Sequence, residues 1–270
     1  MLEVLFSWWE YDFMRRAFFA ILLIMPLFAM LGTMVVNNGM AFFSDALGHS
    51  ALTGVGIGVL LGLADYSLIM VVFAVLFALA MNRIRHSRLS STDTVIGVFS
   101  SCGVALGLVI LSRGGNFSKY QSLLIGDILS ISGGQLLVLG ITLVIVALIW
   151  LLCFNRFHAV SISPALSRSK GMAVGLIDNL FVVIIAVIVM MAIRWVGLLI
   201  INAMLILPAA AARNVAGSMR SYHVTALVFS LFSGILGLLV SYFNAVATGP
   251  VIVLIAAALF FGTFFMREKT

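Results

Sequence analysis

Charged residues are scarce in this chain. Only 9% of its 270 residues are Asp, Glu, Lys or Arg, and 63% are hydrophobic. Soluble domains carry about 25% charged and about 45–50% apolar residues, so this composition excludes a soluble globular fold. The chain is a polytopic membrane protein, and we interpret its net charge of +6 as a sign of topology rather than of nucleic-acid binding.

Cysteines and catalytic motifs are scarce as well. Cys102 and Cys153 lie in apolar runs without CxxC spacing, which excludes a disulfide framework and a paired-cysteine zinc site. The chain has no GxxxxGK[ST] phosphate loop, no HExxH and no GxSxG, so it carries no P-loop ATPase of its own. We therefore expect no enzymatic activity and no permanently bound cofactor.

Long apolar runs are abundant instead. A membrane-spanning helix needs about 20 mainly apolar residues. The runs that qualify or nearly do are 14–36, 41–62, 66–82, 94–112, 134–153, 173–192, 196–212, 223–243 and 250–266. They predict an all-α protein with eight or nine transmembrane helices, in one domain over residues 1–270.

Basic loops predict the orientation of these helices. Residues 82–88 are the strongest basic cluster and should face the cytoplasm. Two spans separate each basic segment from the next, so the same side also receives residues 156–170, 213–220 and 267–269. Loops 113–133 and 244–249 then fall outside. Asp178 lies near the end of a span and His86 in a basic loop, so we expect both at headgroup level or in water.

Asp45 and His49 form a polar pair inside an apolar run. A spacing of four residues puts both side chains on one helix face, with Cβ atoms about 5–6 Å apart. Such groups are costly in hydrocarbon and indicate function, and this donor set suits zinc, manganese or iron. A salt bridge between them, or a proton relay, is the alternative. One chain supplies two convincing metal ligands, so further ligands must come from elsewhere.

Small residues line the same run. Ala46, Ser50, Gly54, Gly58 and Gly62 form a row at intervals of four, and Gly103 and Gly107 repeat the pattern in a later span. Such rows allow another helix to approach closely. We expect them to serve packing.

A short helix is predicted between two later spans. Ser163 suits the N-cap, Pro164 the first helical position and Gly171 the residue beyond the end. Arg168 and Lys170 complement the helix dipole in the last turn. The segment is either an ordinary connector or a docking element for a cytoplasmic partner.

Pro208 lies within a predicted span and should kink or interrupt its helix, because it removes a backbone hydrogen bond. Broken helices at membrane depth face protein or a water-filled path. Asn202 is expected on the same path or in a hydrogen bond between helices.

Four phrases resemble the membrane subunit of zinc/manganese ABC importers. They are residues 44–50 (SDALGHS), 126–129 (GDIL), 205–212 (LILPAAAA) and 248–250 (TGP), and the likeness covers nearly the whole chain. The Asp-x-x-x-His element is the most specific of the four.

The resemblance implies a permease of the bacterial cytoplasmic membrane with the type II ABC importer fold, similar to cobalamin and iron-siderophore importers. Its partners would be cytoplasmic ABC ATPases, an extracytoplasmic metal-binding protein and a second permease subunit, which is another copy of this chain in a homodimer or else a close relative. Asp45 and His49 match the metal-path residues, and zinc or manganese would be the cargo. Residues 154–172 would hold the coupling segment, with Ser163, Pro164, Ala165, Leu166 and Arg168 in its helix.

Two alternatives remain open. A permease of the same fold for a metal chelate would not need two metal ligands in its path. A self-sufficient, proton-coupled secondary transporter would use Asp45 and His49 as a proton relay and need no ATPase.

Overall fold

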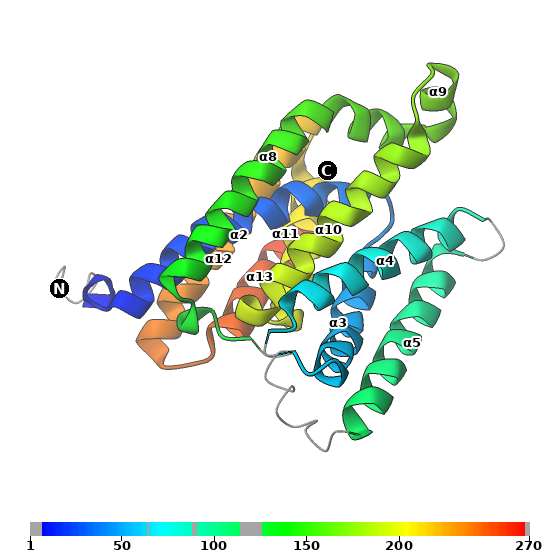
Figure 1. The fold of residues 1–270 in the computed structure, drawn as a ribbon. Helices are drawn as coiled ribbons and strands as arrows, with labels where there is room; N and C mark the ends of the chain where they lie inside the picture. Colours follow the sequence, from blue (N-terminus) through cyan, green and yellow to red (C-terminus); the bar gives the residue numbers. More distant parts are fainter. Residues whose placement is uncertain (1–6, 64, 88–90, 114–125, 268–270) are drawn as a thin grey trace. The chain divides into compact units, whose positions relative to one another are not determined.

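All the regular secondary structure in the described residues is helical. The structure is a computed structural model that describes residues 7–63, 65–87, 91–113 and 126–267 (Figure 1). In chain order the elements are η1 (Ser7–Glu10), α2 (Asp12–Asn37), α3 (Phe43–Leu60), α4 (Ser67–Arg85), α5 (Thr92–Arg113), η2 (Ile128–Ser130), α8 (Gly133–Ile162), α9 (Pro164–Ser169), α10 (Val174–Val196), α11 (Leu198–Val215), α12 (Met219–Asn244) and α13 (Thr248–Arg267). Most of the predicted loop 113–133 and the end of the basic tail lie outside these ranges.

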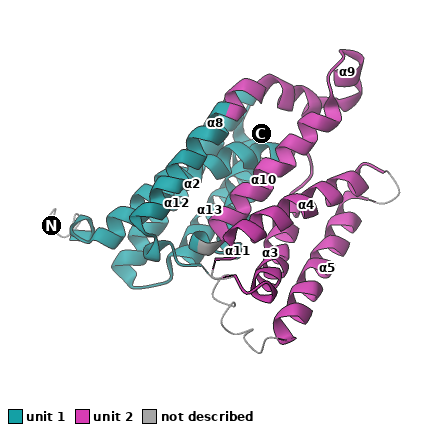
Figure 2. Cartoon of the chain, viewed as in Figure 1, with its two compact units in different colours: residues 1–36, 125–148, 195–270 teal, residues 37–124, 149–194 magenta. Residues whose placement is uncertain are grey.

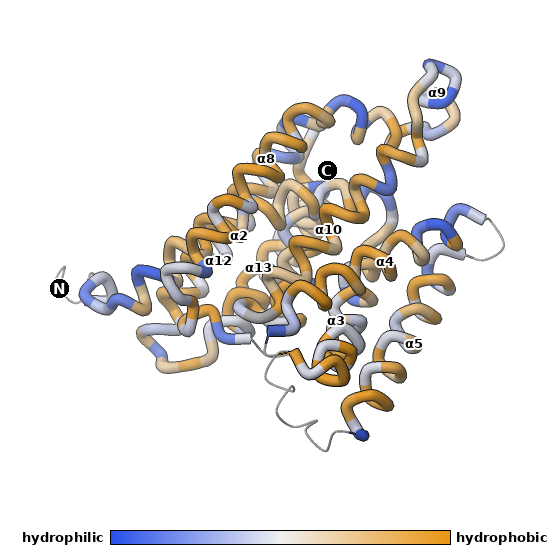
Figure 3. The backbone as a smooth tube through the Cα atoms, viewed as in Figure 1, coloured by the Kyte–Doolittle hydropathy of each residue, from blue (hydrophilic) through white to orange (hydrophobic). Residues whose placement is uncertain are grey.

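A long helix covers each of the nine predicted apolar runs in this part of the chain. By length and composition, seven of them can cross a membrane: α2, α4, α5, α8, α10, α12 and α13. Figure 3 shows apolar residues along most of their lengths and polar residues at several helix ends and around α9. The other two long helices are α3, which carries Asp45 and His49, and α11, whose apolar stretch Ile200–Val215 is shorter. Asp45, His49 and Asn202 therefore lie on the two long helices that are not among the seven candidate spans.

The chain divides into two compact units (Figure 2). Unit 1 comprises residues 1–36, 125–148 and 195–270. Unit 2 comprises residues 37–124 and 149–194. Unit 1 contains α2, the first half of α8, and α11 to α13, whereas unit 2 contains α3 to α5, the second half of α8, α9 and most of α10.

Close backbone approaches hold unit 1 together. Helices α11, α12 and α13 pack on one another. A Cβ atom on Gly32 of α2 would lie 2.1 Å from the carbonyl oxygen of Leu205 in α11, so this contact needs glycine. The Ser230 hydroxyl of α12 donates to the Met25 carbonyl oxygen of α2 at 3.0 Å, which satisfies a polar group in an apolar interior.

Unit 2 confirms the packing role of the small-residue rows. Helix α3 packs on α4 and α5. A Cβ on Gly54 would lie 2.9 Å from the Met70 Cα of α4, and a Cβ on Gly107 of α5 would lie 2.8 Å from the Thr53 nitrogen. Gly62 is the exception, since it follows the end of α3 with a φ of +67° and open space around it. The buried faces of α3 are thus its contacts with two neighbouring helices.

Of the two effects predicted for Pro208, a kink or an interruption, the interruption is wrong. Helix α11 continues through Pro208, which lies inside it. Proline removes one N–H donor, but residues 209–212 are alanines, the best helix formers, and they carry the helix onward. The chain breaks earlier, at Gly197 between α10 and α11, where φ is 82° and ψ is 157°. Glycine adopts that conformation without steric cost.

Candidate transport site

Asp45 and His49 lie side by side on the partly open face of α3. Asp45 is in the first turn, where the helix dipole stabilises a carboxylate. Its side chain is 38% exposed and that of His49 is 33% exposed, whereas most other residues of α3 are buried. The predicted common face is therefore confirmed, and it is the side of the helix that α4 and α5 leave accessible.

The distance between the two groups suits a shared ion. His49 Nε2 lies 3.5 Å from Asp45 Oδ2, longer than the usual hydrogen bond of about 2.9 Å. Two donor atoms bound at about 2.0–2.2 Å to a tetrahedral ion lie about 3.4 Å apart. Among the described residues, no cluster of three or more His, Cys, Asp or Glu side chains surrounds such a position. The pair alone supplies two donor atoms, fewer than the four of a tetrahedral site.

The short helix predicted after Ser163 is confirmed as α9. The Ser163 Oγ accepts a hydrogen bond from the Leu166 N–H at 3.2 Å, and Pro164 occupies the first turn. Gly171, with a φ of +77°, ends it, and the Gly171 N–H donates to the Arg168 carbonyl at 2.9 Å. Ala165, Leu166 and Arg168 are exposed, and Leu166 is 56% exposed. The helix offers an apolar and a basic side chain to its surroundings.

The end of unit 2 near α9 brings the predicted cytoplasmic loops together. One hollow there is lined by residues from the end of α4, the start of α5, the end of α8, α9 and the start of α10. The loops around residues 82–88 and 156–170 therefore lie at the same end of the unit, as their charges predict.

Asn202 and Pro208 lie in α11 of unit 1, whereas Asp45 and His49 belong to unit 2. Asn202 is half-buried and Pro208 is buried. The two residues are six positions apart on one helix, within the part of unit 1 that packs on α12 and α13.

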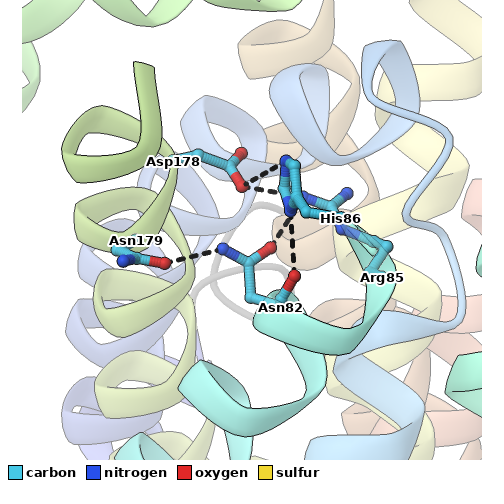
Figure 4. Close-up of polar contacts among 5 residues, drawn as sticks. All are labelled: Asn82, Arg85, His86, Asp178 and Asn179. Carbon is cyan, nitrogen blue, oxygen red and sulfur yellow. Dashed lines mark hydrogen bonds and ion pairs between the residues drawn. The ribbon is translucent and has the colours of Figure 1, made fainter. Parts of the chain in front are cut away.

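Sequence reasoning missed an ion pair between α4 and α10. Arg85 Nη2 donates to Asp178 Oδ2 at 2.9 Å, and each side chain is only 10% exposed (Figure 4). Asp178 is therefore buried and not in water, and exposed His86 lies 3.4 Å from the same carboxylate oxygen. The two partners are 93 residues apart in the chain, so no local pattern revealed them.

Comparison with known protein families identifies the class of transporter to which the chain belongs. Residues 10–267 match the ABC 3 transport family. The chain belongs to that family. It is a multi-pass membrane protein of the bacterial plasma membrane, with the all-helical fold of ABC importer permeases that the sequence predicts.

Relatives with assigned roles include zinc and manganese transport proteins. The high-affinity zinc uptake system membrane protein ZnuB of Haemophilus influenzae is 33% identical over 242 residues, or 89% of this chain and 92% of that protein. The manganese transport system membrane protein MntC of Listeria monocytogenes is 26% identical over 260 residues, or 96% and 92% of the two chains.

Solved structures agree with the fold. A chain of PsaBC from Streptococcus pneumoniae in complex with Fab superposes with a TM-score of 0.85 at 28% identity, covering 98% of this chain and 96% of that one. An inward-facing ABC transporter described as of the metal-chelate type gives a TM-score of 0.72 at 14% identity, covering 94% and 86%. The second likeness supports the fold alone.

Proposed function

We propose that the chain is the membrane permease subunit of an ATP-driven importer of divalent zinc or manganese. The observation that carries the proposal is the accessible Asp45–His49 pair, with an N–O separation of 3.5 Å, in a family whose relatives are named for zinc and manganese transport. The chain transports and does not catalyse. ATP hydrolysis then belongs to separate cytoplasmic ATPase subunits of the ABC type.

The metal is cargo that passes between Asp45 and His49 of two permease copies. Two copies supply two carboxylates and two imidazoles, which is a full first shell for tetrahedral zinc. Manganese accepts the same donors and favours additional oxygen ligands, so water would complete its shell. A second copy of this chain supplies the missing half most simply, as a homodimer. Iron is a third possible cargo for this donor set.

The exposed surface of α9 is the proposed contact with the ATPase. Ser163 and Pro164 fix the start of the helix, while Ala165, Leu166 and Arg168 present the surface that docks. An exposed leucine beside an arginine suits a groove with an apolar floor and an acidic rim. An extracytoplasmic metal-binding protein delivers the ion at the opposite membrane face. Asn202 and Pro208 are assigned to the pathway in α11, and both units form one permease domain over residues 1–270.

Metal uptake by the intact system tests the proposal. Vesicles that contain the permease, its ATPase and its binding protein should accumulate zinc or manganese only when ATP is present. Uptake driven by a proton gradient without ATP would instead identify a secondary transporter. Uptake of a metal chelate that persists after Asp45→Ala and His49→Ala would identify a chelate permease. Competition among zinc, manganese and iron ranks the cargo ions.

A further inference from the structure

A polar network joins the last turn of α4 to the first turns of α10. Arg85 Nη2 donates to Asp178 Oδ2 at 2.9 Å and to Asn82 Oδ1 at 2.7 Å. Asn82 Nδ2 in turn donates to Asn179 Oδ1 at 2.8 Å, and His86 Nε2 lies 3.4 Å from the Asp178 carboxylate (Figure 4). Charged and amide groups thus connect the two helices at two adjacent points.

The network is a direct polar link between these helices at this end of unit 2. Helix α4 also packs on α3 and α5. Hollows of about 300 Å³ and about 680 Å³ flank the pair, and Asp178 and His86 line both of them. An apolar interface would fill such space. The contact between α4 and α10 therefore includes directional polar bonds at this point.

The ion pair has a strong reason to stay closed. The Arg85 and Asp178 side chains are each 10% exposed, and a charge left at such depth without its partner is strongly unfavourable. As long as the ion pair is intact, the two helix ends that it joins move together. A movement of one helix therefore displaces the other. Apolar side chains next to a hollow can shift position and would transmit the movement less directly.

The network lies between α9 and the helix that bears Asp45 and His49. The connection from α9 to α10 is short and tied by its backbone, since the Met172 N–H donates to the Ser167 carbonyl at 3.0 Å. Asp178 follows within the first two turns of α10. At the other end, α4 packs on α3 through Gly54. The sequence α9, α10, α4, α3 is thus a continuous chain of contacts within unit 2.

We propose that Arg85 and Asp178 are positioning residues for transport, which hold α4 to α10 so that movement of α9 reaches the Asp45–His49 pair. Asn82, Asn179 and His86 fix the orientation of the ion pair. The inference rests on the proposed function and extends it, because it names how the docking helix is linked to the metal-binding helix. Coupling of this kind requires a physical network that connects the two sites.

The test measures metal uptake and ATP hydrolysis together in vesicles that carry the whole importer. Asp178→Asn removes one charge and keeps the side-chain shape. We expect uptake per assembled complex to fall about tenfold or more while ATP hydrolysis stays within about twofold, a separation typical of lost coupling. The exchanged pair, Arg85→Asp with Asp178→Arg, should recover much of the uptake. Arg83→Gln, which removes an exposed cation from the same helix end, is the matched control and should leave both rates unchanged.

Three results would overturn the inference. The first is a wild-type ratio of uptake to hydrolysis in Asp178→Asn. The second is an equal fall in metal uptake and ATP hydrolysis, which would mean that the ion pair has a purely structural role. The third is an exchanged pair no better than the single variants. Failure of the proposed function looks different, because the wild-type importer itself would then accumulate no metal with ATP.

Discussion

In the described part of unit 2, two aspartates each pair with a basic side chain. The two pairs differ in the exposure of their side chains and in their N–O distance. Asp45 and His49 share one helix, are about one-third exposed and stand 3.5 Å apart. Asp178 and Arg85 come from two helices, are 10% exposed and stand 2.9 Å apart. The first pair is accessible and has the separation of two ligands of one ion, whereas the second is a short, buried ion pair.

The difference separates a binding role from a holding role. Arg85 carries a permanent charge and pairs with Asp178 at 2.9 Å, which suits a role in holding two helices together. An imidazole can bind a metal ion, and under the proposed function the neighbouring Asp45 carboxylate is the second ligand. Under the two proposals, the same residue type, aspartate, serves transport in α3 and connection in α10.

Removing the accessible pair should have the largest effect. We expect Asp45→Ala and His49→Ala each to lower metal uptake by about a hundredfold or more, because each deletes a direct ligand of the cargo. Membrane insertion and binding of the ATPase should be unchanged. Isotope uptake in vesicles, with the exposed carboxylate variant Asp93→Ala as control, measures the difference. Wild-type uptake in both variants would remove the pair from the pathway.

The loss of folding free energy should rank the two pairs in the opposite order from the loss of uptake. Asp178→Ala leaves a buried guanidinium without its partner and should cost about 3–5 kcal/mol of folding free energy. Asp45→Ala removes one member of an exposed pair and should cost less than about 1 kcal/mol. Denaturant unfolding of the purified chain in detergent gives both values. Equal losses would mean that the pairs do not differ in the way their burial indicates.

Packing behind the accessible pair should have a smaller effect. A side chain at Gly107 would overlap α3 at Leu52 and Thr53, so Gly107→Leu should destabilise unit 2 by about 1–3 kcal/mol and displace Asp45 and His49. Gly97 lies on the same helix with open space around it, so Gly97→Leu is the matched control. The unfolding temperature and the rate of metal uptake should both fall in Gly107→Leu. Neither should change in Gly97→Leu.

The smallest effect is expected at the start of α9. Ser163→Ala deletes the hydroxyl that accepts the Leu166 N–H and should weaken the short helix by about 1 kcal/mol. Uptake should fall a few-fold, and ATPase binding should weaken with it. Ser169→Ala, which alters an exposed hydroxyl at the far end of the same helix, should have little effect. Identical binding by both variants would argue against docking through α9.

The sequence predicts those features whose evidence is local. The apolar runs locate the nine long helices of the described residues, and the cap and proline locate α9. A spacing of four residues puts Asp45 beside His49. Helix ends are less certain, since α8 continues to Ile162, nine residues beyond its predicted apolar run. Its last turns contain Asn155 and Arg156, because a helix can continue past the hydrocarbon into polar surroundings.

Features that depend on distant partners could not be predicted. Arg85 and Asp178 each resemble a residue at the membrane surface until the fold brings them together. Pro208 carries the usual signal of a broken helix, but the alanines after it keep α11 continuous, and the break lies at Gly197 instead. A single sequence shows the penalty of one residue and not the compensation its neighbours provide.

The N-cap of α9 has a further consequence for the rate and strength of assembly. A helix of six residues is too short to persist by itself in water. Here Ser163 and Pro164 at one end and Gly171 at the other hold its shape within the free permease. A partner that recognises this helix therefore meets a preformed surface, and association does not have to supply the entropy of folding a flexible loop.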